Sequence, residues 1–226
     1  MALIERVLPD GAEGAELYTD APAEYLYPEE AAAVAGASPG RQEEFRSART
    51  CARRALDRLG LPPVPLLPAE RGAPGWPDGV VGSITHCPGY RAAAAARRGP
   101  LLALGVDAEP DLPLADRVLA RIALTEERDQ VAELQRSHTD HAWDRLLFSA
   151  KECVYKCWFP LTGRWLGFHQ ARIRFGPNSG ADDGIFTVTL LEPDPALDRL
   201  RPPPALTGRW SAGPGLLVTG LELTAG

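Results

Sequence analysis

The segment from Trp143 to Pro160, WDRLLFSAKECVYKCWFP, restricts the fold of this chain more than any other part. At 100° per residue its apolar side chains fall on one stripe, which predicts a helix packed on a core. The stripe consists of Leu147, Ala150, Val154, Cys157 and Trp158. Glu152 and Lys156 are four residues apart on the opposite face. Taken alone, they are best explained as a solvated ion pair that stabilises the helix by about 0.3–0.5 kcal/mol.

A second acidic pair changes that interpretation. The apolar run 101–106 predicts a buried strand, and Asp107 and Glu109 follow it directly. Because side chains alternate along an extended chain, these two acids point to the same side. By itself an Asp-x-Glu pair indicates only a polar strand end. With Glu152 on a facing helix, three carboxylates become available to Mg²⁺, which prefers oxygen ligands and usually binds through a few carboxylates plus substrate phosphates.

Basic side chains accompany these acids. Lys151 and Lys156 lie beside the helical acid, and His86 follows the residues GSIT. The predicted helix over 41–58 holds six arginines against three acidic residues, a local charge of +3. A solvated helix surface is the alternative explanation for these arginines. Together, the carboxylates, lysines, histidine and basic helix indicate a phosphoryl-transfer site, in which positioning and electrostatics do most of the catalysis.

Composition excludes several other classes. The 226 residues suffice for one large domain or two small ones. A net charge of −6 argues against general nucleic-acid binding. The chain has neither an apolar run of membrane-spanning length nor an export signal, so we expect a cytoplasmic protein that does not cross a membrane. Its four cysteines lack the close Cys-x-x-Cys spacing of zinc sites, and no Gly-x-Ser-x-Gly motif supports a serine hydrolase.

Around these motifs the periodicity predicts an α+β chain. Each half has a long helix followed by strands, which permits a duplicated architecture. Helices are expected from Pro28, over 41–59, 114–122 and 126–135, and in the central segment. Strands are expected at 3–8, 80–85, 90–96, 101–106, 168–175, 185–191, 209–212 and 216–223. The proline-rich stretches 61–80 and 193–205 are expected to be loops.

The motifs are recognisable as a set. FSAKECVYK, ending at Lys156, resembles the signature W/F-x-x-K-E-x-x-x-K of the Sfp-type 4′-phosphopantetheinyl transferases. GVDAE, ending at Glu109, resembles their G-[IV]-D-x-E motif, and PGWPDGVVGSITH, ending at His86, resembles their loop-and-histidine segment. All three occur in the order and spacing of the family. KCWFPLTGRWLGF is typical of actinobacterial members that activate polyketide and nonribosomal peptide synthases.

This resemblance implies a fold and a reaction. The fold is α+β, a pseudo-twofold pair of similar α/β halves with coenzyme A bound between them. Residues 1–105 would form the half with the basic helix and the histidine loop, and 106–226 the half with the metal and catalytic motifs. The enzyme would transfer the 4′-phosphopantetheine arm of coenzyme A to a serine of an acyl or peptidyl carrier protein and release 3′,5′-ADP. An internally duplicated member is expected to be a monomer.

The resemblance also implies roles for individual residues. Asp107, Glu109 and Glu152 would hold Mg²⁺, or Mn²⁺ in its place, with the coenzyme A pyrophosphate. Glu152 would be the base for the incoming serine hydroxyl. Lys156 would stabilise charge on the pyrophosphate, and Lys151 would contact phosphate. The full set of implied coenzyme A contacts is Arg41, Arg49, Arg53, Arg71, Pro74, Thr85, His86, Lys151 and Lys156.

Two other functions are compatible with parts of this pattern. A catalytically idle coenzyme A- or carrier-binding scaffold would need no complete acidic trio, yet the trio is present. A metal-dependent phosphohydrolase would use water in place of serine, but the sequence offers no second cluster of metal ligands. The carrier protein itself would dock on the arginine-rich helix or on apolar residues around Leu112–Ile122.

Overall fold

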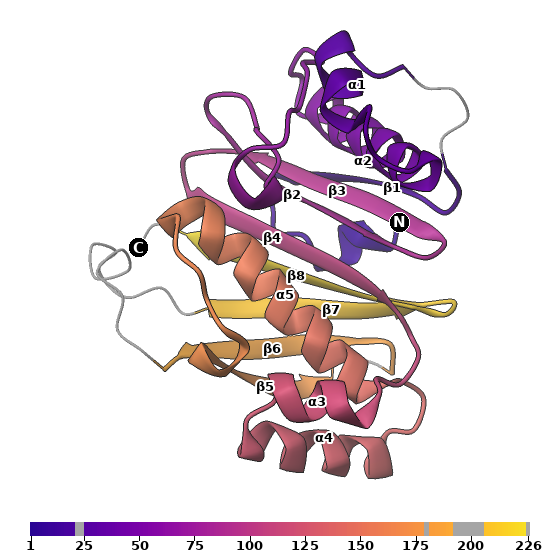
Figure 1. Ribbon diagram of the computed structural model, residues 1–226. Coiled ribbons are helices and arrows are strands. Elements are labelled where there is room, and N and C mark those ends of the chain that lie inside the picture. The colour runs from indigo at the N-terminus through magenta and orange to yellow at the C-terminus, as the bar shows by residue number, and fades with distance from the viewer. Residues whose placement is uncertain (21–24, 179–180, 192–205, 225–226) are drawn as a thin grey trace.

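A computed structural model describes residues 1–20, 25–178, 181–191 and 206–224 (Figure 1). The strands are β1 (Ala12–Leu17), β2 (Val80–Cys87), β3 (Tyr90–Arg97), β4 (Leu101–Pro110), β5 (Ala171–Asn178), β6 (Asp183–Leu190), β7 (Leu206–Gly213) and β8 (Leu216–Thr224). The α-helices are α1 (Pro28–Val34), α2 (Pro39–Arg58), α3 (Asp116–Ile122), α4 (Thr125–Ser137) and α5 (Trp143–Thr162). Short 3₁₀ helices are η1 (Ile4–Val7), η2 (Glu70–Gly72) and η3 (Phe168–Gln170).

The strands form two antiparallel sheets with related connectivity. The first has the order β1-β3-β2, and the second β4-β8-β7-β6-β5. In the first half β1 leads through α2 to β2 and β3, and β1 pairs with β3. In the second half β4 leads through α5 to β7 and β8, and β4 pairs with β8. The α+β fold of two similar halves is thus confirmed, with β5 and β6 extending the second sheet. The predicted division between residues 105 and 106 falls inside β4.

Each half packs its long helix on its own sheet. Figure 1 shows α2 against the smaller sheet, α5 running across the larger one, and α3 and α4 at one end of α5. Beneath α5 a single apolar core joins it to the larger sheet. The predicted central helix is confirmed, and all five residues of its apolar stripe are buried. It continues through Pro160 to Thr162 and ends at Gly163, whose φ of 65° is the left-handed conformation that glycine supplies at helix ends.

A close approach of α5 to β4 explains the glycine of the GVDAE motif. A Cβ atom at Gly105 would lie against the Cys153 carbonyl and 2.8 Å from the Cys157 backbone nitrogen. Only glycine therefore lets the helix backbone rest on the strand at this point. The Cys153 thiol in turn donates a hydrogen bond to the Gly105 carbonyl at 3.2 Å. This contact fixes the height of α5 above the acids that follow on β4.

Two strands expected from the sequence need correction, and one expected loop lies outside the residues that the structure describes. Residues 3–8 do not form a strand: η1 lies there, and the Leu3 and Ile4 N–H groups donate to the Glu16 carboxylate at 3.0 and 2.8 Å. The first strand is β1. The strand expected from Phe168 begins only at Ala171, because η3 precedes it. The loop predicted over 193–205 lies outside the described residues. Nowhere in the described ranges is there a helix with the length and apolar character needed to span a membrane.

Candidate active site

The two sheets meet where β2 and β4 lie side by side. Side chains bridge these two edge strands: Ser83 Oγ donates to the Val106 carbonyl at 3.4 Å, and Thr85 Oγ1 donates to Asp107 Oδ1 at 3.2 Å. Thr85 Oγ1 also accepts from the Ala108 N–H at 3.0 Å. These bonds bring the end of the histidine segment next to the first acid of the GVDAE motif. The two motifs therefore meet at the boundary between the halves.

Lys156 reaches this boundary from α5. Its Nζ lies 2.6 Å from Asp107 Oδ1 and 3.2 Å from Thr85 Oγ1. Burial by itself would lower the pKa of Lys156, but the charge and hydrogen bond of Asp107, together with the charge of Glu152, raise it above its ordinary value. The ammonium is therefore held charged. Asp107 Oδ2 is buried and has no hydrogen-bond partner among the described residues, so one carboxylate oxygen remains to be satisfied.

The negative charge of Asp107 acts on the two other acids, Glu152 and Glu109. Burial raises the pKa of Glu152, and repulsion by Asp107 raises it further, against the opposing effect of Lys156. Burial and Asp107 likewise raise the pKa of Glu109, although Arg145 lowers it again through an ion pair at 3.0 Å. In the described ranges, no group of three or more histidine, cysteine, aspartate or glutamate side chains is arranged to hold a metal ion. Asp107, Glu109 and Glu152 thus make a negatively charged cluster beside Lys156.

On the other side of Thr85, β2 meets the basic helix. His86 Nε2 lies 3.1 Å from Arg41 Nη1, which also pairs with Glu44 at 3.1 Å. Partial desolvation lowers the pKa of the exposed His86, Glu44 opposes this shift, and the positive charges of Arg41 and Lys156 lower the pKa further. The result is an electropositive corner beside the acidic cluster.

Two further arginines of α2 are not a solvated surface. Arg49 is 5% exposed, donates through Nε to the Leu66 carbonyl at 2.7 Å and lies 3.9 Å from the centre of the Phe45 ring. Burial lowers the pKa of Arg49 to about 10, so it remains a cation at neutral pH. Arg53 pairs with the buried Glu30 at 2.9 Å. The alternative of a solvated helix surface is therefore wrong for both, and the guanidinium of Arg53 already has an internal partner.

Lys151 does not join the acidic cluster. Its ammonium donates to the carbonyls of Phe168 and Ala171 at 2.6 and 2.9 Å and pairs with Glu127 at 2.9 Å. Both charged side chains are 1% exposed. Burial lowers the pKa of Lys151, and Glu127 counteracts the shift. Adjacent residues on a helix are rotated by about 100° around its axis, so the side chains of Lys151 and Glu152 point to different sides of α5.

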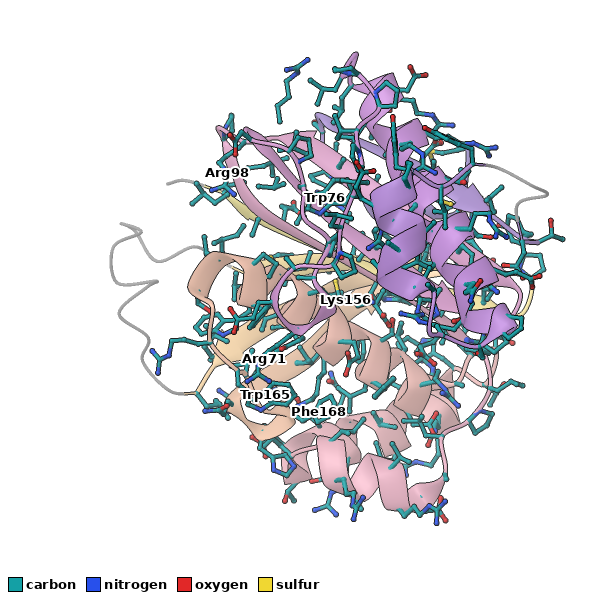
Figure 2. The ribbon with its side chains drawn as sticks, turned by 45° about the horizontal axis from the view of Figure 1, so that its top comes forward. Arg71, Trp76, Arg98, Lys156, Trp165 and Phe168 are labelled. Atoms are coloured by element: carbon teal, nitrogen blue, oxygen red, sulfur yellow. The ribbon has the colours of Figure 1, made fainter. Side chains whose placement is uncertain are left out.

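A cavity of about 190 Å³ lies between the two halves next to these groups. The segment 71–74 and residues 82–84 line it from the first half, and Glu152, Lys156 and Pro160 line it from α5. Figure 2 shows Arg71 beside Trp165 at this boundary. The Arg71 guanidinium carbon lies 5.7 Å from the centre of the Trp165 ring. The cavity is thus lined by the charged side chains of Arg71, Glu152 and Lys156 and by the aromatic rings of Tyr155 and Phe159.

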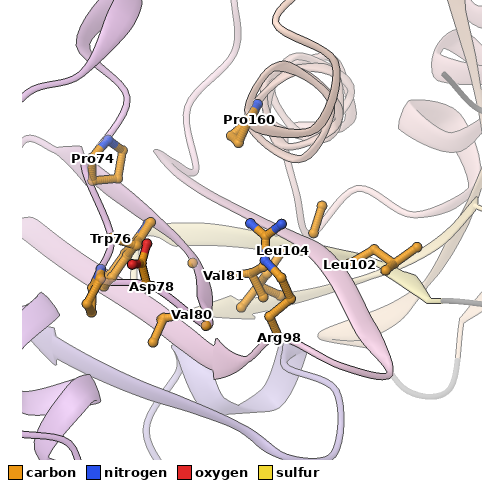
Figure 3. A pocket seen from close by; sticks show the side chains of 13 residues that line it. Pro74, Trp76, Asp78, Val80, Val81, Arg98, Leu102, Leu104 and Pro160 are labelled. Carbon is orange, nitrogen blue, oxygen red and sulfur yellow. The ribbon is translucent and has the colours of Figure 1, made fainter.

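A second cavity of about 410 Å³ adjoins the first, and Pro74, Gly82 and Pro160 line both (Figure 3). Trp76 and Arg98 flank it from the first half. Neither residue has a role in the sequence-based prediction. Its lining combines residues 74, 76–82, 98, 102–104 and 160, which are distant in the sequence, so no local sequence pattern indicates it.

The loop 111–114 follows the acids of β4, and hydrogen bonds hold it against the start of α5. His141 Nδ1 lies 2.8 Å from Asp111 Oδ2, and its Nε2 lies 3.1 Å from Asp182 Oδ1. Asp111 Oδ1 accepts from the Ala142 N–H at 2.8 Å. The histidine ring packs edge-on against Trp210 at 5.8 Å. A histidine between two carboxylates thereby ties the end of β4 to the start of α5.

We expect the free energy of unfolding to depend on pH through His141. Burial would lower its pKa, but the hydrogen bonds and charges of Asp111 and Asp182 outweigh that effect and raise it. A raised folded-state pKa stabilises the fold fully below the unfolded value of about 6.5, and the contribution is lost as the pH rises through the folded-state pKa. Urea unfolding of wild type and His141→Gln across this range measures the effect. Their difference in stability should shrink as the pH rises, and a pH-independent difference would contradict the assignment.

Comparisons with known proteins cover both halves. Residues 29–96 match the 4′-phosphopantetheinyl transferase N-terminal domain, and residues 103–198 match the 4′-phosphopantetheinyl transferase superfamily. The 4′-phosphopantetheinyl transferase Svp of Streptomyces mobaraensis is 51% identical over 226 residues, which cover 99% of this chain and 90% of that protein. PptT of Mycobacterium tuberculosis is 44% identical over 98% of each chain. Npt of Nocardia iowensis is 44% identical over 97% of this chain and 99% of its own.

Proposed function

This chain belongs to the 4′-phosphopantetheinyl transferase superfamily, and from that premise we propose how its residues carry out the reaction. Enzymes of this family transfer the 4′-phosphopantetheine group of coenzyme A to carrier proteins. The observation that carries the proposal is the convergence of Asp107, Glu152 and Lys156 beside a cavity between the two halves. We assign the chain the acyl and peptidyl carrier proteins of polyketide and nonribosomal peptide synthases as substrates, the cytoplasm as its location and a monomer as its active form.

Coenzyme A would lie between a first half of residues 1–105 and a second half of residues 106–226. Its 3′-phosphate would bind at the electropositive corner of Arg41, Thr85 and His86, with Arg49 behind it. Arg71 and Pro74 would line the adenine side of the cavity. We assign Arg53 and Lys151 supporting roles, because Glu30 and Glu127 already pair with them.

Two observations support a divalent cation at the acidic cluster. Asp107 Oδ2 is a buried carboxylate oxygen without a partner in the described part of the chain, and Asp107 raises the pKa of both neighbouring acids. Excess negative charge of this kind is what a bound cation relieves. We propose that Asp107, Glu109 and Glu152 hold Mg²⁺, with Mn²⁺ as a substitute. Mg²⁺ commonly binds through few carboxylates plus substrate phosphates, so the coenzyme A pyrophosphate would complete the site. When bound, the ion would neutralise charge on the pyrophosphate.

Different residues of the chain then carry out different steps of the reaction. The carrier serine Oγ attacks the phosphorus nearest to pantetheine, and the bond from that phosphorus to the oxygen leaving with 3′,5′-ADP breaks. Glu152 accepts the hydroxyl proton, directly or through water, which is a task for a carboxylate of raised pKa. Lys156, held charged by Asp107, offsets the negative charge that develops on the departing phosphate. The products are a phosphodiester on the carrier and 3′,5′-ADP.

The carrier would approach along the loop 111–114 and α3. Leu112 is 62% exposed, and it follows the acidic cluster by only a few residues. An exposed leucine on a loop that is anchored on both sides is suited to contact an apolar patch of a partner. The overall charge of −6 also disfavours a general attraction to acidic carriers, so a local apolar contact is required.

Arg49→Ala should weaken coenzyme A binding. We expect KM for coenzyme A to rise about tenfold, with a much smaller change in kcat, because removing one charge-assisted phosphate contact costs about 1.5–3 kcal/mol. Steady-state kinetics at a saturating carrier concentration measures both constants. Arg54→Ala is the matched control, since Arg54 is an exposed arginine of the same helix. An unchanged KM in Arg49→Ala would remove Arg49 from the coenzyme A site.

The proposed reaction is tested by intact mass spectrometry of an apo carrier protein incubated with the enzyme, coenzyme A and Mg²⁺. The carrier should gain the mass of one phosphopantetheine arm, and EDTA should abolish the gain. No gain on several acyl and peptidyl carriers, despite coenzyme A binding, would favour an idle scaffold instead. Release of phosphate from coenzyme A without a carrier would favour a phosphohydrolase.

A further inference from the structure

Arg145, in the first turn of α5, uses all three of its guanidinium nitrogens. Nη1 pairs with Glu109 Oε2 at 3.0 Å. Nε donates to the Leu112 carbonyl at 2.9 Å, and Nη2 donates to the Pro113 carbonyl at 3.4 Å. The Arg145 side chain is 22% exposed and that of Glu109 18%, so water competes only weakly for these bonds. One side chain therefore joins a member of the acidic cluster to the loop that presents Leu112.

The start of α5 holds the loop 111–114 through several hydrogen bonds, and the Asp111 N–H also donates to the Gly215 carbonyl at 2.9 Å. Its first residue, Asp111, accepts from the Ala142 N–H at 2.8 Å, and its last, Leu114, donates its N–H to Asp144 Oδ2 at 2.8 Å. The two carbonyls between them accept from Arg145. Loop carbonyls facing the protein need donors as much as those of a strand do. Without Arg145, the middle of the loop would lose its attachment while both ends kept theirs.

Arg145 also offsets the negative charge of Glu109. Asp107 and Glu109 repel each other across one strand face, and each has its own cation: Lys156 at 2.6 Å for Asp107 and Arg145 at 3.0 Å for Glu109. The ion pair with Arg145 fixes Glu109 Oε2. Glu109 Oε1 takes no part in this ion pair, so it is the oxygen that we assign to another ligand.

We propose that Arg145 is a positioning residue that orients Glu109 toward the metal and makes that orientation depend on the loop 111–114. The inference rests on the proposed function, in which Glu109 contacts the metal and Leu112 contacts the carrier. A planar guanidinium can serve a carboxylate and two carbonyls at once, whereas the ammonium of lysine is a single point charge. Substitution of Arg145 can therefore separate its contact with Glu109 from its contacts with the loop carbonyls.

The test compares Arg145→Met and Arg145→Lys with wild type. Calorimetry of Mn²⁺ binding to the enzyme–coenzyme A complex, without carrier, reports whether Glu109 is oriented for the metal. KM for an apo carrier at saturating coenzyme A reports whether the loop 111–114 is held in place. Arg145→Met should weaken Mn²⁺ binding and raise the carrier KM by at least about fivefold each. Arg145→Lys should restore Mn²⁺ binding but not the carrier KM. Arg172→Lys is the control, because it alters an exposed pair with Glu126 at 3.5 Å.

A Glu109→Gln background separates this inference from the function it rests on. There, adding Arg145→Met should not weaken Mn²⁺ binding further, but should still raise the carrier KM. Normal Mn²⁺ binding in Glu109→Gln would refute the metal role of Glu109. A clear Glu109→Gln defect combined with normal Mn²⁺ binding and a normal carrier KM in Arg145→Met would overturn the inference about Arg145 alone. If Arg145→Met does not fold, the contrast between Arg145→Lys and wild type decides: a normal carrier KM in Arg145→Lys overturns the inference.

Discussion

Glu152→Gln should abolish carrier modification while sparing coenzyme A binding. The substitution preserves size and shape but removes the proton acceptor, and positioned general bases contribute about 10²–10⁴-fold to rate. The carboxylate is partly buried between Asp107 and Lys156, and burial raises its pKa toward the range in which it can take a proton from serine. We therefore expect kcat to fall by at least about 10²-fold. The dissociation constant of coenzyme A should change little, since its phosphates contact other residues.

Mass-spectrometric transfer rates and coenzyme A calorimetry on the same preparation measure this prediction. Glu126→Gln is the control, because Glu126 is an exposed glutamate that pairs with Arg172 on the surface. If Glu152→Gln retains more than about a tenth of the wild-type kcat, Glu152 is not the base. If it instead loses coenzyme A binding together with activity, its role is to hold the pyrophosphate, and another group must accept the proton.

The parts of the site that lie on regular periodicity could be predicted from the sequence. Apolar spacing placed Glu152 and Lys156 on the exposed side of α5, and strand alternation placed Asp107 and Glu109 on one side of β4. Each prediction needed only the geometry of a single element. The family resemblance then connected the elements, and the structure brings β2, β4 and α5 together at one boundary.

The sequence did not indicate the ion-pair partners that are distant along the chain. Lys151 looked like a phosphate ligand because it precedes Glu152, but its carboxylate partner is Glu127, on another helix. Arg53 looked solvated or ligand-binding, yet it pairs with Glu30. The sequence predicted no role for Arg145, although this residue contacts both the acidic cluster and the loop 111–114. A charge pattern within one helix cannot identify an ion-pair partner that only tertiary folding supplies.

Asp107→Asn should be the most damaging substitution among the acids of β4. Asp107 is 4% exposed and binds both Lys156 and Thr85 through Oδ1, while its Oδ2 has no partner in the described residues. The amide would leave the Lys156 ammonium without its counter-ion and would be a poor ligand for a divalent cation. We expect transfer to fall by at least about 10³-fold and the free energy of unfolding to fall by about 1–3 kcal/mol. Glu109→Gln should cost less activity, because Arg145 already neutralises that carboxylate.

The double variant Asp107→Asn/Lys156→Met separates the loss of stability from the loss of catalysis. Removing one member of an enclosed ion pair leaves an uncompensated charge, whereas replacing both members is often neutral for stability. Urea unfolding should therefore show the double variant to be more stable than Asp107→Asn alone, while its transfer rate stays at the background level. If activity returned together with stability, Asp107 would act only by holding the fold. If the Asp107→Asn single variant transferred within tenfold of wild type, the metal and the charge on Lys156 would not depend on Asp107, and the site would have to be centred on Glu109 and Glu152.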